Sequence, residues 1–338
     1  MRYIGHLGLA CLIGVLSPVA RADFSNEMAE ASTPLSEGVP EVAVVRLQSL
    51  LNKDLPEPQW RAVAEKLAEA QVAANEPEAT LLLLTDTRLR DLPWAKFWRA
   101  QALASLHRWA EALPLYEELA GDVSPFQKAA VSGAGDTLRA LGKREEALRK
   151  FILLAHDKEW GTRAQLRAAE LHIELGNAPE ARRLLEQLQP VSVAERRERR
   201  VLRGRLELIS HRAGRAIEMF QAILKRPEAT PHPILLAALF GIAEAHLQLK
   251  TPETGDDVLE RFMDRNYTDP DLPLLFAKLD ELYRAEHKPS RNELEKWVRR
   301  PEQPRRTFAR WYLARMSNHV HLRFGGAKRQ DFEIRLCS

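Results

Sequence analysis

Apolar and small residues recur at helical spacing along most of this chain, and the whole pattern repeats about every 34 residues. One column of small residues, 33, 35, 34, 35 and 39 residues apart, comprises Ala79, Ala112, Ala147, Ala181, Ala216 and Gly255. Four residues after each stands a bulky apolar residue: Leu83, Tyr116, Phe151, Leu185, Phe220 and Leu259. Twelve residues before the last five lies a second small column: Ala100, Gly135, Ala169, Gly204 and Ala243. Because helices approach closely only where side chains are small, the pattern predicts stacked helix pairs.

Helix-breaking residues mark the turns between these helices. Within pairs, the breaks fall at Asn75 with Pro77, His107 with Arg108, Leu141 with Gly142, Gly176 with Asn177, and Ala213 with Gly214. Between pairs stand Pro93, Pro125, Pro190, Pro227 and Pro270, where proline can begin or end a helix. No strand-type alternation precedes residue 318. The sequence therefore predicts an all-α protein, an α-solenoid of stacked antiparallel helix pairs.

Several of these units resemble the tetratricopeptide repeat. The best, from Val131 to Ala155, matches through Gly135, Leu138, Gly142, Ala147 and Phe151. The unit at 93–124 matches through Ala100, Leu103, Trp109, Ala112 and Tyr116, with His107 in place of the turn glycine. The unit at 162–190 matches through Ala169, Gly176, Ala181 and Leu185. The unit at 197–227 matches through Gly204, Ala216 and Phe220. The unit at 236–265 matches through Ala243, His246 and Phe262. The resemblance covers residues 60–265 well and 42–316 loosely. It implies a right-handed superhelix that binds other proteins and has no cofactor.

The chain divides by pattern into five segments. Residues 1–22 have a basic start at Arg2, a largely apolar stretch, and the small-residue site Ala20-Arg21-Ala22, so we expect a secretory signal cleaved after Ala22. The less favoured alternative is a lipoprotein signal using Cys11. We interpret residues 23–41 as a flexible leader, 42–265 as tetratricopeptide-like repeats, and 266–316 as degenerate helical repeats. Val42 begins the second helix of an incomplete first pair.

Residues 317–338 form a tail that differs in composition from the rest. The segments 319–324 and 332–336 alternate polar with apolar residues around Gly325 and Gly326. This alternation is typical of a β-hairpin. An altered reading frame or a truncation scar explains the tail equally well.

Charge and cysteine content exclude some classes of protein. Lysine and arginine number 50 against 47 aspartate and glutamate residues, so the net charge is +3 and a general nucleic-acid binder is disfavoured. After cleavage at Ala22 the single remaining cysteine is Cys337, which leaves no intramolecular disulfide. Beyond the signal, no apolar run suggests a transmembrane span, and the segment 234–243 is interpreted as one buried helix.

The family resemblance also implies a binding groove along the first helix of each pair. Carried over by position, its lining is Phe97, Gln101, Ser132, Asp136, Arg139, Arg163, Leu166, Glu170, Val201, Arg205, Phe240 and Glu244. The lysine and asparagine set with which some family members hold a terminal carboxylate is missing. We therefore expect a protein-binding groove of unknown sequence preference.

A basic patch is a second candidate site. Arg196, Arg200 and Arg203 share one side of a helix, so they form either a patch for an anionic partner or a solvated face beside Glu195 and Glu198.

Metal and catalytic sites are not expected. Among the histidine and carboxylate sets, only Glu207 and His211 share a helical face, and no third ligand accompanies them. No nucleophile motif, phosphate-binding loop or metalloprotease motif is present.

The sequence thus predicts an exported, non-enzymatic scaffold that binds another protein in the cell envelope, most simply the periplasm. One alternative is an accessory subunit that positions an envelope polymer-processing enzyme. The other is a structural protein that associates with copies of itself.

Overall fold

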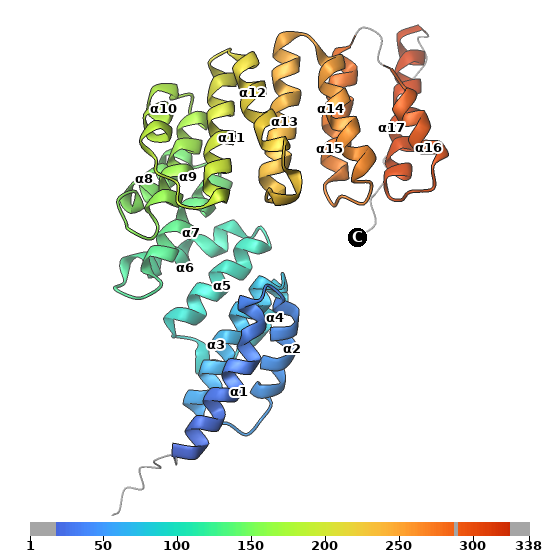
Figure 1. The fold of residues 1–338 in the computed structure, drawn as a ribbon. Helices are drawn as coiled ribbons and strands as arrows, with labels where there is room; N and C mark the ends of the chain where they lie inside the picture. Colours follow the sequence, from blue (N-terminus) through green and yellow to red (C-terminus); the bar gives the residue numbers. More distant parts are fainter. Residues whose placement is uncertain (1–17, 287–289, 325–338) are drawn as a thin grey trace, which may run out of the picture. The chain divides into compact units, whose positions relative to one another are not determined.

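The computed structural model describes residues 18–286 and 290–324, which form α-helices and two short 3-10 helices without a strand (Figure 1). The chain divides into two compact units: unit 1 extends up to His156 and unit 2 begins at Asp157. Each unit consists of consecutive helix pairs, and unit 2 ends with the unpaired helix α17 (Arg305–Phe324). The predicted all-α fold of stacked helix pairs is confirmed.

Unit 1 contains the first eight α-helices. These are α1 (Pro18–Ser36), α2 (Pro40–Leu51), α3 (Glu57–Ala73), α4 (Pro77–Leu83), α5 (Pro93–Ser105), α6 (Trp109–Gly121), α7 (Gln127–Ala140) and α8 (Arg144–Leu154), with the 3-10 helix η1 (Thr87–Leu89) before α5. Several begin at proline, whose fixed φ and missing N–H suit the first turn of a helix.

Unit 2 contains the remaining helices. These are α9 (Gly161–Glu174), α10 (Ala178–Gln187), α11 (Val193–Ile209), α12 (Ala213–Leu224), α13 (His232–Leu249), α14 (Pro252–Arg265), α15 (Leu272–Ala285), α16 (Asn292–Arg299) and α17 (Arg305–Phe324), with η2 (Pro227–Ala229) before α13. A capping box begins α11: the Ser192 side chain accepts from the Glu195 N–H, while the Glu195 carboxylate accepts from the Ser192 N–H.

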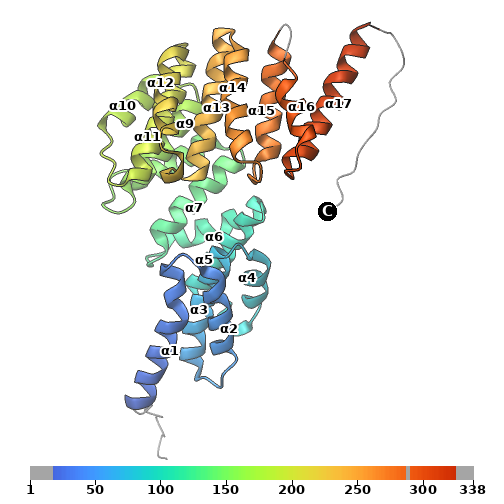
Figure 2. The same cartoon turned by 45° about the vertical axis from the view of Figure 1, so that its right-hand side comes forward.

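Odd-numbered and even-numbered helices play different parts in the packing. In unit 1, α1 contacts α3, α3 contacts α5 and α5 contacts α7, and in unit 2 the odd-numbered helices from α9 to α17 contact one another in the same succession. Figure 2 shows α13, α14 and α15 side by side in unit 2. Within each unit the odd-numbered helices therefore form a continuous layer, and the even-numbered helices pack against it.

The small residues of the two columns lie against the bulky side chains of the third column. A Cβ added to Gly135 would lie 2.7 Å from Cζ of Phe151, whose ring is fully buried. The ring of Phe220 lies between two glycines in the same way, since added Cβ atoms on Gly204 and Gly241 would come within 2.5 and 2.4 Å of it. The small residues thus make room for the aromatic ring of a neighbouring helix.

In the seven pairs from α1–α2 to α13–α14, the turn between the two helices contains one residue with positive φ. In chain order these are Gly38, Asn75, His107, Gly142, Gly176, His211 and Lys250, with φ between 54° and 78°. Four of the predicted turns coincide with this column. The fifth prediction, at Gly214, is wrong, because α12 already begins at Ala213 and His211 makes the turn.

The predicted flexible leader is also wrong over most of its length, because residues 18–36 form α1. Ala31 is buried, and Phe24, Met28 and Leu35 pack against the same core cluster as α2 and α3. Their spacing of four, three and four residues is a helical stripe, diluted among polar neighbours. As expected, the helix that contains Val42 is the second of its pair.

The tail differs from the hairpin interpretation. The backbone is helical through Phe324 at the end of α17, so the predicted first strand, 319–324, is wrong. Upstream, Ala309, Tyr312 and Met316 are buried at helical spacing, and α17 packs against α15 and α16. The predicted second strand, 332–336, lies outside the described residues, and the scar interpretation stays untested.

One helix among the described residues, α13, is long and apolar enough to cross a membrane. Half of this stretch is buried, and α13 contacts α11, α12, α14 and α15. In the structure it is the central helix of unit 2.

Candidate functional site

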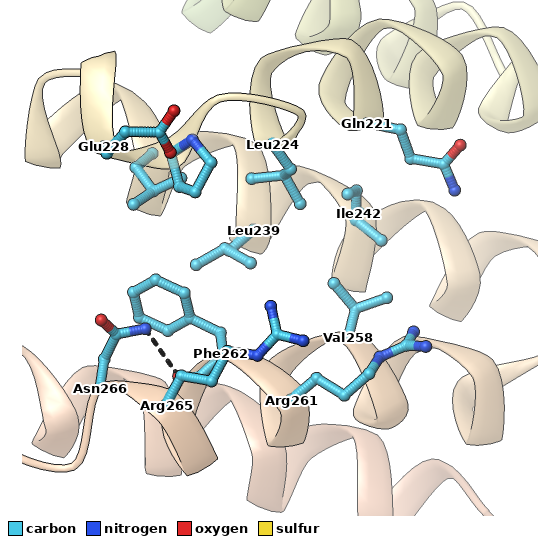
Figure 3. Close-up of a pocket in the computed structure, with 12 residues that line it drawn as sticks. Gln221, Leu224, Glu228, Leu239, Ile242, Val258, Arg261, Phe262, Arg265 and Asn266 are labelled. Atoms are coloured by element: carbon cyan, nitrogen blue, oxygen red, sulfur yellow. Dashed lines mark hydrogen bonds between the residues drawn. The ribbon is translucent and has the colours of Figure 1, made fainter.

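An apolar pocket of about 560 Å³ opens in unit 2 between α12 and α14, with α13 at its base (Figure 3). Its lining comprises Gln221, Leu224, Pro227, Glu228, Leu235, Leu239, Ile242, Val258, Arg261, Phe262, Arg265 and Asn266. The volume lies within the range of natural ligand pockets, which is roughly 300–1,000 Å³. Unlike the predicted groove, this pocket involves the even-numbered helices.

Side chains from three helices form the apolar interior. Leu239 and Ile242 of α13 are almost fully buried at the base, and Leu224 of α12 and Phe262 of α14 are half-buried at the sides. Figure 3 shows Leu224, Leu239 and Phe262 facing the same space. A partner that fills this space would remove apolar surface from water, at about 25 cal/mol per Å².

The rim is polar and carries two arginines from one helix. Arg261 and Arg265 are both exposed on α14, one turn apart. Arg261 Nε donates to the carbonyl oxygen of Asp257 at 2.9 Å, and within the described ranges no hydrogen bond or ion pair involves the Arg265 side chain. Glu228 lies across the opening on η2. The rim can therefore accept a carboxylate beside the apolar interior.

The local sequence explains why a pocket forms here. The small columns are 39 residues apart between this pair and the preceding one, four or more beyond the other intervals. The extra residues form η2, and Thr230 tightens the connection by donating its Oγ1–H to the carbonyl oxygen of Arg226 at 2.8 Å. Because Pro227 and Glu228 of η2 line the pocket, the insertion builds one of its ends.

The predicted basic patch lies on α11, and the side chains of Arg196, Arg200 and Arg203 are all exposed. Counting 39 residues onward, the equivalent positions in the next pair are Leu235, Leu239 and Ile242 at the base of the pocket. The same position on successive pairs is thus basic in one and apolar in the next. Glu195 and Glu198 do not neutralise the patch as expected: Glu195 caps α11 and Glu198 pairs with Arg167. Binding by the patch stays a prediction.

Phe97 does not line an open groove. Its side chain is 6% exposed, and its ring lies 5.1 Å from those of both Trp98 and Phe126. It belongs to the core of unit 1 because the first helix of a pair must also pack against the second. Ser132, Leu166 and Val201 are buried as well.

The other predicted groove residues lie on odd-numbered helices. Gln101, Asp136 and Arg139 are half-buried in unit 1; Arg163 is exposed, and Glu170, Arg205, Phe240 and Glu244 are half-buried, in unit 2. The structure brings Glu170 and Arg205 together in an ion pair of 2.7 Å. Arg167 extends this network from Glu170 at 3.2 Å to Glu198 at 3.1 Å. These charges join α9 to α11.

Glu207 and His211 do not form a metal site. The Glu207 carboxylate pairs with Arg212 and with Arg182, and the Arg212 guanidinium holds the pKa of Glu207 below its usual range. His211 occupies the turn after α11. A different set, His232 with Asp269 and Asp271, converges in unit 2. The sequence did not reveal it because His232 precedes the two aspartates by 37 and 39 residues.

A cluster of carboxyl groups lies between α14 and α15. Burial first, and then the neighbouring Glu286 carboxyl, together raise the pKa of Asp256 to about 8. Burial also raises the pKa of Glu260 to about 7, although the Tyr283 hydroxyl donates a hydrogen bond to it. Because the nearby Glu253 and Asp257 carboxylates also disfavour ionisation, this interface is more stable when its acids are protonated.

Comparisons with known proteins agree with this description. The sequence model of the tetratricopeptide repeat matches residues 163–189, which span most of α9 and α10. No curated protein is significantly similar in sequence.

Two solved structures are similar in fold. A tetratricopeptide repeat protein from Parabacteroides merdae superposes with a TM-score of 0.58 at 17% identity, over 76% of this chain and 99% of the other. A chain of the APC/C hetero-tetramer Cut9–Hcn1 superposes with a TM-score of 0.55 at 15% identity, over 89% of this chain and 57% of the other. Such repeats typically form non-enzymatic scaffolds for protein–protein interaction. The repeat match places a tetratricopeptide repeat at residues 163–189, and the stacked helix pairs and the two neighbours show that the chain has the fold of tetratricopeptide repeat proteins.

Proposed function

We propose that this chain is an exported scaffold of the cell envelope, located in the periplasm, that binds a segment of another protein in the apolar pocket of unit 2. The observation that carries the proposal is the pocket itself, an open apolar space with two exposed arginines at its rim. Large apolar patches that stay exposed in a folded protein commonly mark interaction sites.

The residues that line the pocket indicate which side chains the partner segment carries. Leu239, Ile242 and Phe262 offer an interior for one or two bulky apolar side chains. Arg261 and Arg265 would pair with carboxylates that flank those side chains. We therefore infer an amphipathic partner segment with an acidic edge, bound through an apolar anchor.

The pocket is favoured over the predicted groove for two reasons. Phe97, the aromatic residue expected to anchor a partner in unit 1, is buried in the core. In unit 2, Glu170 and Arg205 already pair with each other, so a partner would have to replace that bond.

Export is proposed from the amino-terminal pattern of Arg2, an apolar stretch and Ala20-Arg21-Ala22. Cleavage after Ala22 would leave residues 23–36 of α1 with the apolar stripe that packs on α2. The mature chain would therefore keep its first helix pair.

The test is to recover binding partners from envelope extract with the mature chain and, in parallel, with three variants that each carry two charge reversals. Arg261→Glu with Arg265→Glu changes the pocket rim, Arg196→Glu with Arg200→Glu the basic patch, and Arg139→Glu with Arg163→Glu the predicted groove. We expect one partner, recovered by wild type, to fall about 10-fold with the pocket variant alone, because rim charges contribute to complementarity.

Circular dichroism would verify that each variant is folded. Equal recovery by wild type and the pocket variant would refute the pocket, and loss with either of the other two variants would move the site there. Recovery of nothing but the chain itself would favour self-association. The intact mass of the chain from cell fractions tests export, since the proposal requires a chain that begins at Asp23.

A further inference from the structure

Three side chains of metal-ligand type converge where the start of α13 meets the connection between α14 and α15. Nε2 of His232 lies 3.0 Å from Oδ2 of Asp271 and 3.4 Å from Oδ1 of Asp269. One ligand atom from each residue lies within 4.8 Å of the other two. None of these residues contributes to the pocket lining, although Asn266 and Glu228 of the pocket precede them closely in the chain.

The backbone around all three residues is constrained. His232 stands between Pro231 and Pro233, and Pro270 separates the two aspartates. The Asp271 N–H donates to Oδ1 of Asp269 at 2.9 Å, which fixes the two carboxylates relative to each other. Although Asp271 is the residue before α15, its side chain does not cap that helix and instead faces His232.

The charges of this cluster are incompletely balanced by the protein. The Asp269 side chain is 6% exposed, and within residues 18–286 and 290–324 no lysine or arginine pairs with it or with Asp271. A neutral histidine can donate only one proton from Nε2, yet two carboxylates approach that atom. Two buried or half-buried carboxylates beside an imidazole favour an additional positive charge.

The geometry fits a small divalent transition metal. A tetrahedral ion with ligand distances of about 2.0–2.2 Å requires its ligand atoms to be about 3.3–3.6 Å apart. The observed separations of 3.0 and 3.4 Å are close to that requirement. One imidazole and two carboxylates are ligands of the type that Zn²⁺ accepts.

We propose that His232, Asp269 and Asp271 bind one Zn²⁺ ion, with water in the remaining position. The ion links the first turn of α13 to the start of α15, two segments that are far apart in sequence. It therefore stabilises the folded chain in proportion to its occupancy. This proposal is independent of partner binding in the pocket.

The test is titration of the metal-stripped full-length chain with Zn²⁺ by calorimetry, followed by thermal unfolding with and without the ion. We expect one equivalent to bind and the melting temperature to rise. His232→Ala should weaken binding by about 100-fold or more, at least as much as the loss of an outer-shell partner. His156→Ala, an exposed histidine of unit 1, is the matched control and should bind like wild type.

Asp271→Asn provides a second variant, since Asp271 is one-third exposed and its amide preserves the shape of the side chain. This variant should also lose Zn²⁺ binding while remaining folded. It therefore tests the site even if His232→Ala does not fold. Binding that is unchanged in both variants would overturn the proposal. So would the absence of saturable binding in the micromolar range, which would leave the cluster as a hydrogen-bonded pair of connections.

Discussion

At the scale of single residues, the turns keep their backbone conformation while their residue type changes. Gly142 and Gly176 occupy two of them, but His107, His211 and Lys250 hold the same left-handed conformation with a side chain. A residue with a Cβ is strained in this region by about 1–2 kcal/mol. These turns therefore retain their geometry at a cost in stability, and sequence patterns that rely on glycine find only some of them.

Lys250→Gly should raise the free energy of unfolding by about 0.5–1 kcal/mol, because glycine adopts the φ of 58° without strain. Urea denaturation followed by circular dichroism would measure the change. The matched control is Lys225→Gly after α12, where φ is −65° and glycine should instead destabilise. Equal effects of the two substitutions would contradict the argument from strain.

Residue-level prediction succeeded where the signal was local. The columns through Gly135, Ala147 and Phe151 were visible because close packing demands small and bulky residues at fixed offsets. Phe97 was assigned to a groove by its position in the family pattern, and position along a helix does not say whether neighbouring helices cover a side chain. That distinction depends on the neighbouring helices.

At the scale of helices, the sequence predicted most of the helices but not the pocket that lies between α12 and α14. Leu235, Leu239 and Ile242 were interpreted as part of a buried helix, which is correct, yet α12 and α14 leave an opening beside them. The interval of 39 residues was the one available signal, because it indicated extra residues between the pair α11–α12 and the pair α13–α14. The leader was missed because four apolar residues at helical spacing were surrounded by polar ones.

The carboxyl cluster between α14 and α15 gives the fold a pH dependence. The pKa of Asp256 is raised to about 8 in the folded chain, so its contribution to stability is full below the unfolded pKa and is lost as pH rises through the folded value. We expect the free energy of unfolding to fall by about 1–3 kcal/mol between pH 5 and pH 8.

Asp256→Asn should flatten this dependence, since the amide stays neutral throughout the range. Chemical denaturation at several pH values would measure the slope, with Glu218→Gln on the exposed face of α12 as control. A slope that is unchanged in Asp256→Asn, or stability that increases with pH in wild type, would contradict the assignment.

At the scale of the whole molecule, stability comes from contacts between helices that are close in sequence. Each helix pair contacts its neighbours within its unit, as expected for a repeat protein whose folding energy is a sum over adjacent interfaces. The stacked-pair fold could be predicted from the sequence for this reason, because every repeat has small and bulky residues at the same offsets. The His232 cluster could not be predicted, because it joins the first turn of α13 to the connection before α15, and neither position belongs to the repeated columns.

The two compact units should fold independently. Residues 23–156 and 157–338, expressed separately, should each give a helical circular dichroism spectrum and a cooperative thermal transition. Each contains several complete helix pairs with a buried core of its own. A fragment that is unfolded in isolation would show that its stability depends on the rest of the chain.

The composition of α13 has a consequence for how such a chain would leave the cell. Its 18 residues from His232 to Leu249 satisfy the length and hydropathy of a membrane-spanning segment, although in the fold they form the centre of unit 2. A chain that is threaded through a translocation channel before it folds presents this segment to the surrounding lipid. If this chain is exported as proposed, passage through the channel and lateral release into the bilayer compete, and the apolar helix at the centre of unit 2 is the one that slows secretion.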